Sequence, residues 1–173
     1  MRILDLGCGH SDTSRRMWPD AEIVRVDNDP DVLPDVLADV CGLPGDLGQF
    51  DAILAAHILE HLPRTAAIPA LKHWLEFLKP GGELHLMVPD LVWAAEELVR
   101  QRASVHVLMH IYGAQSDAHQ EHHFGYTMIL LRDAIDRAGY IVKSAQTARY
   151  GIRYPAGTDP VVARMLYVVA VKP

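Results

Sequence analysis

Apolar and polar residues alternate along this chain in short runs that predict β-strands. Residues 2–7 form a β-branched and Leu-rich run that ends in glycine, which is typical of a buried strand. Residues 22–27 alternate apolar and polar positions, as a strand with one buried face does. The same criteria predict strands at residues 2–7, 22–27, 36–40, 50–57, 83–88, 140–146 and 165–172.

Runs with a helical period separate these strands. Residues 64–78 place Ile68, Leu71, Leu75 and Leu78 on one face, and Lys-Pro-Gly-Gly follows as a stop signal. Asp90 is suited to cap a further helix. The predicted helices cover residues 11–18, 64–78, 91–102 and 127–138, and residues 103–126 are expected to be irregular and rich in His.

Strands that alternate with helices predict the α/β class, with a doubly wound, mostly parallel sheet and helices on both faces. A chain of 173 residues corresponds to one domain, which we expect to span residues 1–173. In such sheets, ligands bind outside the carboxyl ends of the strands. Functional residues are therefore expected in the loops that follow the strands.

Composition narrows the class of protein. Half of the residues are apolar, and the apolar runs are too short to span a bilayer. Cys8 and Cys41 lie in different motifs, and no basic start precedes an apolar stretch, so we expect a reduced, cytoplasmic protein without a membrane partner. The net charge of −6 makes nucleic acid an unlikely partner, although residues 132–173 carry a local excess of basic residues.

A glycine turn and an acidic residue suggest a nucleoside ligand. Gly7 and Gly9 follow the first predicted strand, and Asp27 ends the second, where a carboxylate can accept hydrogen bonds from ribose hydroxyls. The third glycine of a dinucleotide site is replaced by Asp12, whose charge would repel a phosphate. A cationic nucleoside without phosphate, such as S-adenosylmethionine, suits this charge; alternatively, Asp12 only caps a helix.

The order of motifs resembles that of the class I S-adenosylmethionine-dependent methyltransferases. The resemblance covers residues 2–90 well and continues loosely to residue 139. It is closest to small methyltransferases with an SHVLEH-like stretch after the fourth strand, and it implies a Rossmann-like sheet whose last strand is inserted antiparallel. The motifs are DLGCG, VDNDP, LADVCGLP, FDAILAAHILEHLP and LKPGGELHLMVPD.

The resemblance also implies a role for each matching position. The residues near the methionine end of the cofactor would be Asp5, Gly7, Cys8, Gly9, Ala56 and His57. Asp27 would hold the ribose, with Asn28 beside the adenine. Asp39 would bond the adenine amino group and the Val40 backbone a ring nitrogen. Alternatively, Asp39 caps the next turn, and the Cys8 thiol is expected to pack rather than react.

Two groups of histidines are candidates for acid–base chemistry. The first group is His57, Glu60 and His61. His57 and His61 would share a face if their segment is helical, but their spacing is not that of a zinc-binding HExxH motif. The second group, given at the end of this paragraph, has side chains that could bind zinc. Alternatively, it takes part in acid–base chemistry or belongs to a polar loop without a chemical role. We expect His57, His122 and His123 to be catalytic and assign no metal ligand. The second group comprises His106, His110, Asp117, His119, Glu121, His122 and His123.

Many members of this class carry a helical segment before the first strand that covers the cofactor, whereas here only Met1 precedes it. We expect residues 103–126 to supply the cover as a lid, with dimerisation as an alternative. The leading hypothesis is methyl transfer to a small molecule or a modified base or sugar. The alternatives are a non-catalytic S-adenosylmethionine-binding subunit and an NAD-dependent oxidoreductase.

Overall fold

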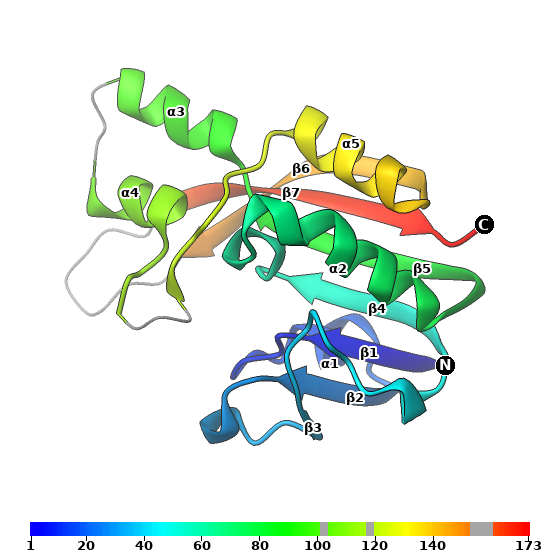
Figure 1. The fold of residues 1–173 in the computed structure, drawn as a ribbon. Helices are drawn as coiled ribbons and strands as arrows, with labels where there is room; N and C mark the ends of the chain where they lie inside the picture. Colours follow the sequence, from blue (N-terminus) through cyan, green and yellow to red (C-terminus); the bar gives the residue numbers. More distant parts are fainter. Residues whose placement is uncertain (101–103, 117–119, 153–160) are drawn as a thin grey trace.

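The computed structural model describes residues 1–100, 104–116, 120–152 and 161–173, which form a seven-stranded sheet (Figure 1). The strand order is β3-β2-β1-β4-β5-β7-β6. Neighbours from β3 to β5 are parallel, and β7 runs antiparallel between β5 and β6, which confirms the expected sheet. The strands are Arg2–Leu6 (β1), Glu22–Asp27 (β2), Val36–Leu37 (β3), Phe50–Ala56 (β4), Leu78–Pro89 (β5), Ile141–Ile152 (β6) and Val161–Val171 (β7).

Helices lie at the predicted places, but the helix expected over residues 64–78 ends at Glu76, and Leu78, expected on its apolar face, begins β5 instead. The side chain of Asp90 accepts a hydrogen bond from Val92 N at 3.0 Å, and Thr127 caps α5 in the same way. Within the described residues no helix is long and apolar enough to cross a bilayer. The elements are α1 (Thr13–Met17), η1 (Pro30–Val32), η2 (Gly45–Leu47), η3 (Leu59–His61), α2 (Arg64–Glu76), α3 (Leu91–Val99), α4 (Val105–Tyr112) and α5 (Met128–Ala138), where η marks a 3-10 helix.

Alternate residues of the strands point to opposite faces of the sheet. Leu84 and Leu86 of β5 belong to the main core, together with residues of α2 and α5, which lie on one face (Figure 1). Between them, His85 points to the second face, where its ring packs edge-on against Trp18, directly after α1, at 4.9 Å. Helices therefore lie on both faces, as predicted.

The expectation of an irregular segment over residues 103–126 is wrong for α4. Ser104 caps this helix by accepting from Val107 N, and Val107 packs with Trp93 of α3 and Ala163 of β7 in a second small core. His106 and His110 interrupt the apolar pattern of α4, so the sequence alone gives no clear helical period. The apolar face of α4 is stabilised by tertiary partners.

The last two strands are longer than predicted, and β3 is shorter. β6 continues to Ile152 and β7 begins at Val161, so that Tyr150 pairs with Ala163 beyond the predicted strand ends. This extension packs beside α3 and α4. Backbone hydrogen bonds hold the two strands together even where apolar and polar residues do not alternate. The apolar pattern therefore predicts strands that are too short.

Trp74 of α2 ties the main core to the segment after β3. Its side chain is fully buried, and its Nε1 donates to Val40 O at 2.7 Å. We expect Trp74→Phe to lower the free energy of unfolding by about 1–3 kcal/mol, because it removes the hydrogen bond to the Val40 carbonyl and leaves a small cavity. Urea unfolding measures this difference, and an unchanged midpoint would contradict the assigned role.

Candidate active site

A cavity of about 520 Å³ opens at the carboxyl ends of the first four strands. Its walls come from segments 7–10, 27–32, 39–41 and 57–63, which follow β1, β2, β3 and β4, and from Gln120. This is where parallel strands bring their following loops together. The expected cofactor residues that line it are Gly7, Gly9, Asp27, Asn28, Asp39, Val40 and His57.

Gly7 and Gly9, which follow β1, both adopt a left-handed backbone, but the space beside each one is used differently. A Cβ on Gly7 would lie 1.7 Å from Ile58 Cδ1, so this glycine leaves space for a side chain of the cavity wall. A Cβ on Gly9 would meet nothing within 4 Å. Gly9 therefore leaves its backbone open to a ligand.

The carboxylate of Asp27 organises the turn after β1. Its Oδ2 accepts from Gly9 N at 2.8 Å, and its Oδ1 accepts from Asp29 N at 3.0 Å. Arg25 donates to Gly9 O at 2.6 Å and holds the turn from the other side. A carboxylate has about four acceptor positions, so Asp27 keeps capacity for further donors at the cavity wall.

Asp39 both shapes a turn and lines the cavity. Its Oδ1 accepts from Cys41 N at 2.7 Å, which is the local capping role considered as its alternative. The residue is exposed at the cavity wall, next to Val40. The bond from Trp74 to the Val40 carbonyl positions this wall from the core side.

Three of the expected cofactor residues do not reach the cavity. Asp5 is buried and accepts from Ser14 Oγ at 2.5 Å, so it holds α1 to the sheet, and burial raises its pKa. Cys8 is buried, and burial raises the pKa of its thiol to about 11. Ala56 ends β4 beside the wall without lining it.

Asp12 does not act as the sequence suggested. It lies at the start of α1 without a capping hydrogen bond from its side chain, and it points to solvent with an exposed fraction of 69%. The Thr13 amide donates instead to Ser11 Oγ at 3.1 Å. The acidic side chains that line the cavity are Asp27, Asp29 and Asp39.

His57 and Glu60 form an ion pair beneath the cavity. His57 has a left-handed backbone (φ 59°) before the turn of η3, so His57 and His61 do not share a helical face. His57 Nδ1 lies 3.1 Å from Glu60 Oε1. Burial lowers the pKa of His57, but the bond and charge of Glu60 outweigh it and raise the pKa above the ordinary value. Burial by itself raises the pKa of Glu60. The hydrogen bond to His57 and the nearby imidazoles of His57 and His61 outweigh burial, so the pKa of Glu60 lies below its ordinary value.

A second cavity of about 290 Å³ lies beside the first. His57 and His61 line both cavities, and His122 lines the second. His123 is exposed and lines neither of them. Asp117 and His119 of the same histidine group lie outside the described residues.

The aromatic wall of the second cavity is Tyr150, which sequence reasoning missed. Tyr150 is on β6, far from any motif, and its hydroxyl bonds His110 Nδ1 at 3.2 Å. Of three other aromatic residues in this part of the chain, Trp93 and Tyr126 are buried and Tyr112 is exposed. None of these three lines either cavity. Only strand pairing brings Tyr150 to the site.

The sheet order, the antiparallel β7 and a cavity above β1 and β2 define the class I methyltransferase fold. The chain belongs to the methyltransferase domain family, which matches residues 1–142. Trans-aconitate 2-methyltransferase of Streptomyces avermitilis is 31% identical over an alignment of 107 residues, which covers 51% of this chain and 39% of that protein. The chain thus spans about two fifths of that relative's length.

Solved structures share the fold at low sequence identity. A SAM-dependent methyltransferase of Methanosarcina mazei superposes with a TM-score of 0.71 at 16% identity, covering 99% of this chain and 92% of that chain. The 1,6-didemethyltoxoflavin-N1-methyltransferase of Burkholderia thailandensis, solved with its substrate and S-adenosylhomocysteine, has a TM-score of 0.63 at 18% identity. The match covers 99% of this chain and 70% of that one.

His110 makes the stability of the protein sensitive to acid. It is buried against Trp93, and burial lowers its pKa from 6.5 to about 4. Between these two pKa values, His110 is protonated in the unfolded chain and neutral in the native state. The free energy of unfolding is therefore highest above pH 6.5 and decreases as the pH is lowered. We expect a loss on the order of 2 kcal/mol from His110 between pH 6.5 and 5.

Urea unfolding at several pH values measures this loss. His110→Phe keeps an aromatic ring against Trp93 and removes the titration. We expect the variant to lose less stability than the wild type over the same pH range. If the free energy of unfolding falls equally with decreasing pH in both proteins, groups other than His110 cause the acid sensitivity.

Proposed function

We propose that this protein transfers a methyl group from S-adenosylmethionine to a small-molecule acceptor. Membership of the methyltransferase domain family supports this activity, and the larger cavity supports the cofactor. The observation that carries the proposal is Asp27, whose carboxylate lines the cavity at the end of β2 while bonding the amide of Gly9. In our proposal it accepts hydrogen bonds from the ribose hydroxyls.

The charge of the cavity favours a cationic nucleoside over a dinucleotide. Asp27, Asp29 and Asp39 all line it, and each would repel a pyrophosphate. S-adenosylmethionine has a sulfonium and an ammonium group and no phosphate. The repulsion of a phosphate that the sequence suggested for Asp12 therefore comes from these three carboxylates, which disfavours NAD.

The second cavity is proposed to hold the acceptor. It meets the cofactor cavity at His57, His61 and Gln120, which line both. Methyl transfer needs this contact, because the acceptor lone pair must approach the methyl carbon in line with the departing sulfur. A new bond to carbon forms, the carbon–sulfur bond breaks, and its electron pair stays on the sulfur of adenosylhomocysteine. The volume of about 290 Å³ suits a small acceptor.

His57 and His122 are the expected catalytic residues that face this second cavity. We propose that His57, held by Glu60, donates a hydrogen bond to the acceptor and orients it. His122 lies in the wall of this cavity, and we propose that the described part of the expected lid over residues 103–126, namely residues 104–116 and 120–126, covers the acceptor. We assign no contact with the acceptor to His123, which is exposed.

The remaining expectations concern the setting of the reaction. We propose a reducing, cytoplasmic setting, which suits the unpaired Cys8 and Cys41. The acidic cavity disfavours a nucleic-acid acceptor, although it leaves a modified base or sugar open as a small molecule. Dimerisation is an alternative source of cover for the cofactor.

Calorimetric titration with S-adenosylmethionine, adenosylhomocysteine and NAD tests the cofactor. We expect Asp27→Ala to weaken binding of adenosylhomocysteine by roughly 30- to 150-fold, corresponding to loss of charged hydrogen bonds worth about 2–3 kcal/mol. Asp12→Ala is the matched control, because it removes a neighbouring carboxylate that does not line the cavity. The control should bind as the wild type does.

Tighter binding of NAD than of S-adenosylmethionine would overturn the cofactor assignment. Equal effects of the two Asp variants would show that net charge, rather than a bond from Asp27, governs affinity. Incubation with S-adenosylmethionine and a metabolite extract then tests transfer. Binding without formation of adenosylhomocysteine would favour the non-catalytic subunit.

A further inference from the structure

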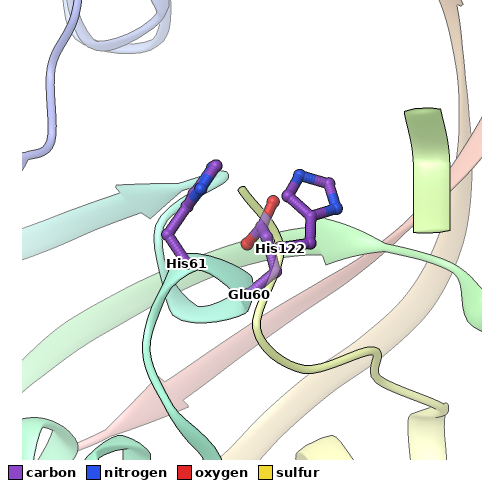
Figure 2. A group of neighbouring side chains, drawn as sticks. All are labelled: Glu60, His61 and His122. Carbon is purple, nitrogen blue, oxygen red and sulfur yellow. The ribbon is translucent and has the colours of Figure 1, made fainter. Parts of the chain in front are cut away.

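Three side chains of types that can ligate a metal meet between the two cavities, and they come from two distant segments. Glu60 and His61 come from η3 after β4, and His122 comes from the loop between α4 and α5 (Figure 2). One ligand atom of each residue lies within 4.8 Å of those of the other two. The sequence placed these residues in two separate histidine groups, and only the fold unites them.

Glu60 supplies an oxygen that lacks a partner. Its side chain is 2% exposed, and its Oε1 pairs with His57 at 3.1 Å. Its Oε2 is buried and has no hydrogen-bond partner among the described residues. A buried carboxylate oxygen without a donor costs free energy, which a bound cation would recover.

His61 is oriented as metal-binding histidines are. Its Nδ1 bonds the Glu121 carbonyl at 2.9 Å, so Nδ1 carries the proton and Nε2 keeps its lone pair. A bond from the second ring nitrogen to a backbone carbonyl is the usual outer support of a metal-ligating histidine. The edge-on contact of the His61 and His122 rings, at 4.9 Å, places the two imidazoles together.

Backbone bonds fix His122 over Glu60. The amides of His123 and Phe124 both donate to Glu60 O, at 2.8 and 3.2 Å. The amide of His122 itself donates to Tyr112 O at 3.0 Å. These bonds clamp the loop to the η3 turn, so the three side chains are brought together before any ion binds.

We propose that Glu60, His61 and His122 bind a divalent transition-metal ion, with zinc as the ion that suits them best. Two imidazoles and one carboxylate match zinc and its neighbours in the first transition row, whereas magnesium and calcium prefer oxygen ligands. Tetrahedral binding at about 2.0–2.1 Å places donors about 3.4 Å apart, a distance that small side-chain rotations reach. This assignment departs from the sequence-based expectation of no metal ligand.

Three protein ligands leave at least one coordination position of such an ion for another molecule. His61 and His122 both line the second cavity, so the open position is expected on that side. The ligand class would be a lone-pair donor such as a hydroxyl, carboxylate or amine. In this arrangement His122 holds the ion instead of taking a proton from the acceptor.

Titration of the untagged, metal-stripped full chain with Co²⁺ tests the site directly, because cobalt in zinc sites absorbs visible light. We expect one equivalent of Co²⁺ to bind and Zn²⁺ to displace it, with no displacement by Mg²⁺. Glu60→Gln and His122→Ala should each weaken Co²⁺ binding at least 100-fold. His123→Ala is the matched control, because it removes an exposed imidazole next to His122 and should bind Co²⁺ as the wild type does.

The outcome is independent of the proposed function, because metal binding is measured without cofactor or acceptor. Circular dichroism and urea unfolding verify that each variant is folded. Failure of the folded wild type to bind Co²⁺ at 100-fold excess would overturn the site. Equal binding by the wild type and His122→Ala would overturn it too, since the ion would then sit elsewhere.

Discussion

Parallel pairing of β1 with β2 and β4 is the constraint on which the rest of the structure depends. It forces the loops after these strands to one edge of the sheet, where each contributes to a single cavity. The Asp27 carboxylate then joins two of these loops by accepting from Gly9 N. The cavity is thus held by a carboxylate–amide bond between strand ends as well as by the apolar core beneath it.

The second cavity depends on a different part of the molecule. The backbone bonds from residues 123 and 124 to Glu60 O attach the loop before α5 to the turn after β4. The extended β6–β7 hairpin supplies Tyr150 to the same place. Two regions that are remote in sequence therefore build the wall facing the larger cavity, and His57 lies where the two cavities meet.

Local signals predicted which residues after β1 and β2 line the larger cavity. Gly7, Gly9 and Asp27 each follow or end a strand that the apolar pattern identifies, and position relative to a strand fixes which edge a residue reaches. The expectation for Asp12 came from its place in the glycine motif, but the backbone after Gly9 turns its side chain to solvent. The role of Asp5 was implied by the family resemblance, and in the structure this strand residue points into a face of the sheet and not to its edge.

The sequence by itself determined the sheet, the order of its motifs and the glycine–acid pair, because these depend on contacts and spacings within short segments. Only the tertiary structure decided that Glu60 and His61 meet His122, that α4 is a helix, and that Tyr150 lines the second cavity. The physical reason is that these features need partners in other elements of the chain, such as Trp93 and Ala163 for α4 and the η3 turn for His122. The side chains of these segments follow no clear apolar period. Strand pairing is made by backbone hydrogen bonds, which form with almost any residue type and so leave little trace in the sequence.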